Sequence, residues 1–291
     1  MTTVGSGKYT YKLIENWAKL PAGDNFAMVS AVASDSQGRI FAFQRKDPPI
    51  IIFDRDGNLL ESWGNGAFSF AHGIFIANDI VYLTDRDSSV CIMYTIDGKP
   101  IQMLGRHGIH SDTGCEVPAT LVPRAAGPFN YPSEMVPSPS GDLYVSDGYR
   151  NARVHRFSND GQLKSSWGQP GKSEAGHFHL PHSLLVENDK VYVCDRENHR
   201  MQLFDLDGEF LEIWDDVQRP MDISVDGEGT LYISEGSVDG SSARVSVLDN
   251  KGGVLARFDC RGPGHGSWVD SHGDIYVGLG EGGVDKFVRQ S

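Results

Sequence analysis

Three histidines stand at the same position of a repeated segment, which makes them candidates for metal binding. The first residues of six copies of that segment read Ser30, His72, Ser133, His182, Met221 and His265. Histidine fills every second copy, so six copies in a ring would direct three evenly spaced imidazoles at one axis. Three convergent imidazoles leave an open coordination position on Zn²⁺. We therefore predict a metal centre at His72, His182 and His265, with Zn²⁺ favoured and Fe, Co or Mn as other divalent ions that imidazole can bind.

An alternative interpretation of this column is a hydrated channel in which histidine is tolerated and binds nothing. The other copies carry Ser30, Ser133 and Met221, so the position accepts several residue types. The regular alternation of histidine with these residues favours the metal centre.

Further along each copy, charged and phenolic side chains recur at a second position. Arg45, Arg86 and Arg196 are equivalent there, and the third copy instead has Gly148 followed by Tyr149. A guanidinium group binds a carboxylate through two parallel hydrogen bonds, which predicts a small-molecule substrate with an anionic group. The arginines could instead form salt bridges between copies. Positive charge beside a phenol favours phenolate, so Tyr149 could act as a general base.

The elements that must position these residues are short strands joined by tight turns. The fourth copy predicts strands over residues 181–186, 190–195, 201–205 and 209–214. Four strands joined in this way form one propeller blade, and a spacing of about forty to sixty residues is typical of propeller repeats. The last copy stops after its third strand, and residues 11–17 are predicted to supply the fourth. We predict an all-β, six-bladed β-propeller in which residues 1–291 form a single domain and the N-terminal strand closes the ring.

Composition narrows the range of partners and compartments. A net charge of −13 predicts no nucleic-acid partner and no attraction to an anionic membrane surface. The N-terminal residues contain no apolar leader, and no apolar run reaches the ~20 residues that span a bilayer. Four cysteines without a C-x-x-C pair indicate a reduced environment, so we expect a cytoplasmic protein.

Acidic motifs of this chain are predicted to be structural. The Asp-x-Asp-Gly runs at 54–57 and 205–208 resemble the start of a calcium loop. They recur at the equivalent hairpin of different copies, which predicts that they form turns. The acidic residues that end the second strands are expected to belong to the hydrogen bonding of each blade. They are Asp85, Asp147, Asp195 and Glu235. Residues 105–130 predict one long loop, which could cover the histidines.

Four sequence runs resemble a known family. They are Tyr-Pro-Ser-Glu-Met at 131–135, Leu-Tyr-Val-Ser-Asp-Gly-Tyr-Arg-Asn-Ala-Arg at 143–153, Leu-Pro-His-Ser-Leu at 180–184 and Val-Cys-Asp-Arg-Glu-Asn-His-Arg-Met-Gln at 193–202. Together they resemble the NHL-repeat propeller of peptidyl-α-hydroxyglycine α-amidating lyase, which cleaves a carbinolamide to a peptide amide and glyoxylate. The resemblance is strongest over residues 127–215 and stays in register over roughly 25–290.

The resemblance implies a set of site residues and cofactors. It places zinc on the three histidines of the column, the catalytic base on Tyr149, and substrate contacts on Arg45 and Arg196. It also implies a structural calcium held by the carbonyls of Val32 and Ile74 and by an Asp after the third histidine. This chain has Gly266 at that place, so calcium is not expected. The family's disulfide partner after the catalytic tyrosine is Arg150 here.

These observations predict a metal-dependent lyase. Its substrate would carry a hydroxyl geminal to nitrogen or next to a carboxylate or amide. The metal would polarise the substrate oxygen, Tyr149 would remove the hydroxyl proton, Arg45 and Arg196 would stabilise developing charge, and Arg86 would bind substrate. Two alternatives stay open. Metal-bound water could hydrolyse a lactone or amide or hydrate a double bond. Otherwise the chain could be a non-catalytic NHL scaffold that binds another protein or RNA, although the acidic net charge disfavours RNA.

Overall fold

The computed structural model describes residues 2–262 and 264–290, which form strands joined by turns and by one long segment between residues 105 and 132. The chain contains two compact units. The central unit comprises Phe68–Pro220, and the terminal unit comprises the residues up to Ala67 and from Met221 onward. Within the described ranges, no helix has the length and apolar character needed to cross a bilayer.

The central unit contains three antiparallel sheets of four strands, and in each sheet the strand order follows the chain. The first sheet is β7 (Ala71–Ala77), β8 (Ile80–Asp85), β9 (Val90–Thr95) and β10 (Pro100–Gly105). The second is β11 (Pro132–Pro137), β12 (Leu143–Asp147), β13 (Arg153–Phe157) and β14 (Leu163–Trp167). The third is β17 (Pro181–Glu187), β18 (Lys190–Asp195), β19 (Arg200–Asp205) and β20 (Phe210–Trp214), with the 3₁₀ turn η1 (Arg196–Asn198) between β18 and β19. A short parallel pair, β15 (Gln169–Pro170) and β16 (His177–Phe178), precedes β17.

The terminal unit also contains three sheets. One is β3 (Val29–Ser34), β4 (Ile40–Gln44), β5 (Ile50–Phe53) and β6 (Leu59–Trp63). Another is β21 (Pro220–Val225), β22 (Leu231–Glu235), β23 (Arg244–Leu248) and β24 (Val254–Asp259). The last joins β25 (Gly264–Val269), β26 (Ile275–Leu279) and β27 (Val284–Arg289) to β2 (Tyr9–Ile14) and β1 (Thr3–Ser6) from the N-terminal part of the chain.

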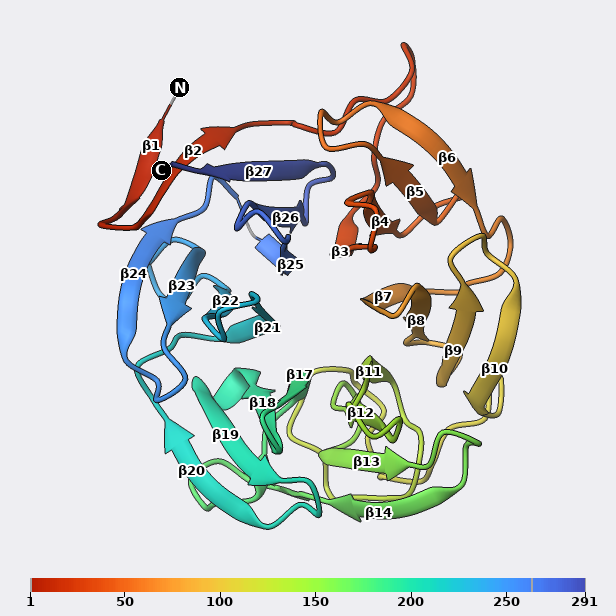
Figure 1. The fold of residues 1–291 in the computed structure, drawn as a ribbon. Helices are drawn as coiled ribbons and strands as arrows, with labels where there is room; N and C mark the ends of the chain where they lie inside the picture. The colour runs from red at the N-terminus through yellow and green to blue at the C-terminus, as the bar shows by residue number, and fades with distance from the viewer. Residues whose placement is uncertain (1, 263, 291) are drawn as a thin grey trace. The chain divides into compact units, whose positions relative to one another are not determined.

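This set of sheets makes the protein an all-β, six-bladed β-propeller, as predicted (Figure 1). The predicted pairing of an N-terminal strand with the last sheet is present, with Tyr11 opposite Arg289. The strand differs from the predicted 11–17 because it begins at Tyr9 and ends at Ile14. Asn16 has a φ of 48°, a left-handed conformation that a strand does not contain, so Trp17 lies outside it.

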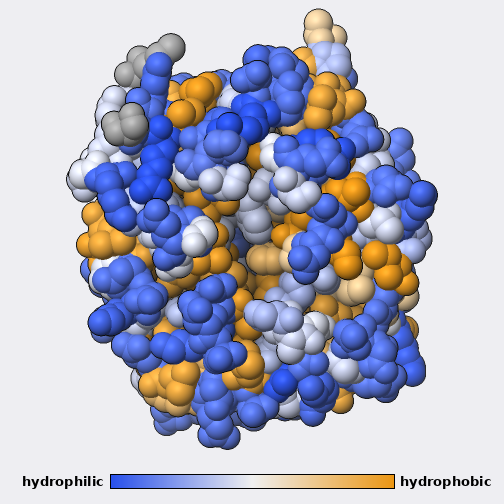
Figure 2. Space-filling model, viewed as in Figure 1, coloured by the Kyte–Doolittle hydropathy of each residue, from blue (hydrophilic) through white to orange (hydrophobic). Residues whose placement is uncertain are grey.

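The inner strands of the sheets form the cores. All five residues of β12 are buried, whereas the outer strand β20 exposes its first three residues. In the central unit, Val136, Val154 and Val193 belong to one apolar cluster, which residues from the predicted long loop also join. Figure 2 shows the visible face covered largely by hydrophilic residues, with apolar ones scattered among them.

The acidic motifs have the structural roles that were predicted. Asp54 Oδ1 accepts the backbone N–H groups of Asp56 at 3.0 Å and Asn58 at 2.8 Å, and Gly57 has a φ of 81°, so this run forms a hairpin turn. The buried aspartates that end the second strands bind the backbone before the first strand of the same sheet. Their pairs are Asp85 with Ser69 and Phe70, Asp147 with Asn130, and Asp195 with His179.

Candidate active site

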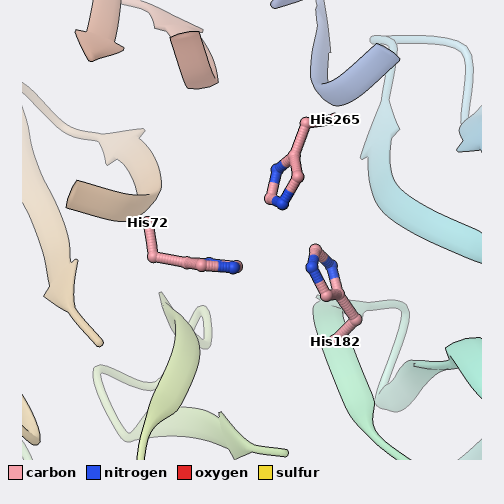
Figure 3. A group of neighbouring side chains, drawn as sticks. All are labelled: His72, His182 and His265. Atoms are coloured by element: carbon pink, nitrogen blue, oxygen red, sulfur yellow. The ribbon is translucent and has the colours of Figure 1, made fainter. Parts of the chain in front are cut away.

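His72 and His182 come together within the central unit. They are the second residues of β7 and β17, each side chain is buried, and their ring centroids lie 4.9 Å apart (Figure 3). Each histidine falls where the register with the second strand shifts, between Ala71 and Ile74 in β7 and between Pro181 and Leu184 in β17. Such bulges redirect a side chain out of the regular pleat.

His265 is built in the same way within the terminal unit. It is the second residue of β25, it is buried, and the register shifts around it between Gly264 and Ser267. Its Nδ1 lies 2.7 Å from the carbonyl oxygen of Ser30. His72 Nδ1 lies 2.8 Å from the carbonyl oxygen of Ser133 in the central unit. Because a carbonyl oxygen only accepts, Nδ1 carries the proton in both histidines.

Each of the three histidines carries a donor atom that a metal ion could use. His72 and His182 each contribute a ring nitrogen from the central unit, and His265 contributes one from the terminal unit. In a neutral imidazole that donates from Nδ1, Nε2 keeps a lone pair for coordination, and the carbonyl fixes the ring orientation. His72 and His265 therefore have the protonation and orientation of metal ligands. A set of three imidazoles fits Zn²⁺ with an open position.

Tyr149 lies beside His72 and His182. Its ring centroid is 4.9 Å from that of His72, and its hydroxyl oxygen is 3.0 Å from Nε2 of His182. Arg196 Nη1 donates to the same hydroxyl oxygen at 3.1 Å. Because a guanidinium only donates, the Tyr149 oxygen accepts from Arg196, and its own proton is available to His182. Tyr149 is 7% exposed as a whole residue, so these bonds form largely away from water.

A common backbone bond positions Tyr149 and the arginines. In each sheet, a residue just after the second strand donates its N–H to a backbone carbonyl. That carbonyl belongs to the residue two positions before His72, Ser133 or His182. The pairs in the central unit are Arg86 with Phe70 at 3.1 Å, Tyr149 with Tyr131 at 3.2 Å and Arg196 with Leu180 at 3.1 Å. Tyr149 thus takes the arginine position of its sheet, after an inserted Gly148. A Cβ at Gly148 would lie 2.2 Å from the carbonyl oxygen of Pro181, so the insertion must be glycine.

The structure places the predicted site residues in two groups. His72, His182, Tyr149, Arg86 and Arg196 lie together in the central unit. His265 and Arg45 belong to the terminal unit, where the backbone N–H of Arg45 bonds to Met28 at 3.0 Å, the same bond that the other arginines make.

Two residues that support Arg196 were missed by the sequence analysis. Glu197 Oε1 accepts Arg196 Nε at 2.9 Å and Arg219 Nη2 at 2.7 Å. Burial works to raise the pKa of Glu197, but the positive charges of Arg196 and Arg219 outweigh it and hold the pKa below its ordinary value. The adjacency of Glu197 to Arg196 is visible in the sequence, whereas Arg219 is brought in from beyond β20.

The long segment between β10 and β11 contacts the backbone around Tyr149. Ala119 donates its N–H to the Tyr149 carbonyl at 2.8 Å, and Thr113 Oγ1 donates to the Arg150 carbonyl at 2.6 Å. The Arg150 guanidinium in turn donates from Nε to the carbonyl of Cys115 at 2.8 Å. These bonds join the long segment to Tyr149 and Arg150.

Gly266, which stands where the resembled family has a calcium-binding Asp, has no room for a side chain. A Cβ there would lie 2.5 Å from Cα of Ala31 and 2.7 Å from the carbonyl oxygen of Ser30. The backbone packing of β25 against β3 therefore explains the glycine and leaves no carboxylate at this position.

Comparison with known proteins shows which families this chain is similar to. Residues 178–204 match the NHL repeat. The chain is 33% identical to human NHL repeat-containing protein 3 over 225 residues, which are 71% of this chain and 60% of that protein. It is 30% identical to peptidyl-alpha-hydroxyglycine alpha-amidating lyase 1 of Drosophila melanogaster over 161 residues, which are 51% of this chain and 27% of that protein.

The resemblance to amidating lyases predicted from the sequence is confirmed, and the relatives include both enzymes and proteins named only for their NHL repeats. The match spans less than two thirds of the length of each of these relatives. Among solved structures, a streptogramin B lyase superposes with a TM-score of 0.69 over 98% of this chain and 100% of that one. The two share 13% sequence identity, so this likeness concerns the fold alone.

Proposed function

We propose that this protein is a metal-dependent lyase that cleaves a small carbinolamide or related hydroxylated carboxylate. The observation that carries the proposal is the hydroxyl of Tyr149, which is buried between Arg196 and His182 and beside His72. The imidazoles of His72, His182 and His265 would hold the metal, with Zn²⁺ favoured. When bound, the metal supplies Lewis-acid polarisation of the substrate oxygen.

Tyr149 is the general base of the proposed reaction. In the deprotonated form of Tyr149, the phenolic oxygen takes the proton of the substrate hydroxyl, the hydroxyl oxygen forms a double bond to carbon, and the carbon–nitrogen bond breaks. The electron pair passes to the amide nitrogen, which receives the proton from Tyr149. A metal ion bound to Nε2 of His182 would occupy the lone pair that otherwise accepts a hydrogen bond from the Tyr149 hydroxyl. Tyr149 would then lose this acceptor, which favours an oxygen that can accept the substrate proton.

The arginines stabilise charge in this proposal. Arg196 already donates to the Tyr149 oxygen, so it favours negative charge on that atom during proton transfer. Arg45 and Arg196 stabilise charge that develops on the departing part of the substrate, and Arg86 contributes to substrate binding. The similarity to amidating lyases supports this assignment at the level of the reaction class.

Metal analysis of the purified protein tests the metal centre. We expect about one zinc ion per chain in the wild type and in His107→Ala, which removes an exposed histidine. His182→Ala should lose the ion, because each imidazole ligand contributes strongly to affinity. Equal metal content in wild type and His182→Ala would contradict the proposed ligand set.

Aldehyde release from α-hydroxyglycine amides tests the reaction. Tyr149→Phe should retain the metal and lose about 10²- to 10⁴-fold in kcat, the range expected for a removed general base. Metal-loaded wild type that is inactive on every carbinolamide would contradict the lyase assignment. Hydrolysis of a lactone or amide that survives in Tyr149→Phe would favour a mechanism in which water is the nucleophile.

A further inference from the structure

Arg86 is held in an aromatic setting at the edge of the proposed site. Its guanidinium carbon lies 3.7 Å from the ring centroid of Phe70, 4.7 Å from that of Tyr149 and 5.4 Å from that of Tyr131. The side chain is 13% exposed. Ring faces attract a cation and displace its water, so the guanidinium is fixed and partly desolvated.

The hydrogen bonds of Arg86 leave its outer end available. Its Nε donates to Asp87 Oδ1 at 2.7 Å, and this is its one ion pair among the residues that the structure describes. Within residues 2–262 and 264–290, no acceptor is bonded to its Nη1 or Nη2. Asp87 is 35% exposed and engages a single nitrogen, so solvent screens much of its charge.

The other two arginines near Tyr149 are engaged differently. Arg196 uses Nε on Glu197 and Nη1 on Tyr149, and Arg150 directs its guanidinium at the carbonyl of Cys115. Of these three side chains, Arg86 alone keeps both terminal nitrogens without a protein acceptor among the described residues. A fixed, partly dehydrated guanidinium with two free parallel donors matches the two oxygens of a carboxylate.

We propose that Arg86 binds a carboxylate of the substrate and makes the protein selective for acids over neutral amides of the same shape. Because the Arg86 guanidinium carbon lies 4.7 Å from the centroid of the Tyr149 ring, a carboxylate bound to Arg86 would lie beside the proposed general base. The substrate class is therefore a small hydroxylated acid. The position of the reacting hydroxyl rests on the proposed function, whereas the carboxylate contact does not require turnover.

The test measures binding of two unreactive probes to the purified full chain by calorimetry. N-acetylglycine carries a carboxylate, and N-acetylglycinamide is its neutral counterpart of equal size. Wild type should bind the acid about tenfold more tightly than the amide, because a charge-assisted hydrogen-bond pair contributes on that scale. Arg86→Gln should bind both probes equally, and Arg86→Lys should keep only part of the preference, because lysine lacks the planar fork.

A matched control is Arg106→Gln, which makes the same change at an exposed arginine of the same unit. It should preserve the acid preference in full. Wild type without a preference, or Arg86→Gln with the wild-type preference, would overturn the proposal. If Arg86→Gln fails to fold, Arg86→Lys decides, because an undiminished preference in that variant would contradict the bidentate contact.

These outcomes separate the inference from the proposed function. Acid preference that depends on Arg86 in a protein inactive on carbinolamides would retain the carboxylate site and reject the lyase. Carbinolamide cleavage with no dependence of KM on Arg86 would retain the lyase and reject the carboxylate site.

Discussion

The loops after β8 and β18 make the same backbone hydrogen bond, but the side chains of their arginines have different partners. Arg86 and Arg196 each follow a buried aspartate and make the same backbone bond two residues before a histidine. Arg196 is then fixed by Glu197 and by the Tyr149 hydroxyl, whereas Arg86 stacks on aromatic rings and pairs through one nitrogen. Equivalent positions in a repeat therefore fix where a side chain begins, and the neighbours decide whether it supports the protein or remains open to a ligand.

The largest effect on stability is expected from Arg196→Gln. The change removes donors to Tyr149 and Glu197 inside a buried network, and lost hydrogen bonds to a charged group are each worth about 1.5–3 kcal/mol. We expect the free energy of unfolding to fall by about 2–3 kcal/mol in urea denaturation. Arg106→Gln should change it by less than about 0.5 kcal/mol. An unchanged free energy of unfolding in Arg196→Gln would show that the two loops do not differ in this way.

An intermediate, pH-dependent effect is expected from Glu197→Gln. The folded pKa of Glu197 is lowered, so its carboxylate stabilises the protein above the unfolded pKa of about 4.3, and that contribution is lost as pH falls through the folded pKa. The variant should be less stable than wild type by about 1 kcal/mol near pH 7. The difference should shrink below about pH 4, as measured by urea midpoints across pH. A constant difference at every pH would contradict this charge pairing.

The smallest effect on stability is expected from Arg86→Gln. A partly exposed ion pair and a cation–ring contact are together worth about 1 kcal/mol or less. The same urea measurement should therefore place Arg86→Gln well above Arg196→Gln in stability. Destabilisation as large as that of Arg196→Gln would indicate that Arg86 is a structural residue, which would weaken its assignment to a ligand.

Much of the fold could be predicted because repetition displays it several times. The strand that begins at Pro181 and the turn at Asp207 and Gly208 are present as predicted. The pairing of β2 with β27 was predicted from the missing strand of the last copy. The strand β1 was not predicted, because Thr3–Ser6 is short and polar and forms by pairing with β2.

The site was less predictable where the repeat is broken. The histidine column was visible as an alternation, yet the bulges that direct these rings depend on strand register, which the sequence does not display. Arg45, Arg86 and Arg196 share a position in sequence, but only side-chain neighbours separate their roles. Thr113 Oγ1 and the Ala119 N–H donate to the carbonyls of Arg150 and Tyr149, and these backbone acceptors carry no sequence signal. The single-domain prediction for residues 1–291 and the assignment to the cytoplasm stay predictions.

The pairing of β2 with β27 has a consequence for the order of events during synthesis. Tyr9–Ile14 is translated long before Val284–Arg289, and joining such distant segments carries a large loop-closure entropy. We therefore expect β2 to stay unpaired during synthesis, while the sheets of the central unit form from strands that are consecutive in the chain. The sheet that contains His265 is expected to form last. A nascent chain would therefore form the strands that position His72 and His182 before the strand that positions His265.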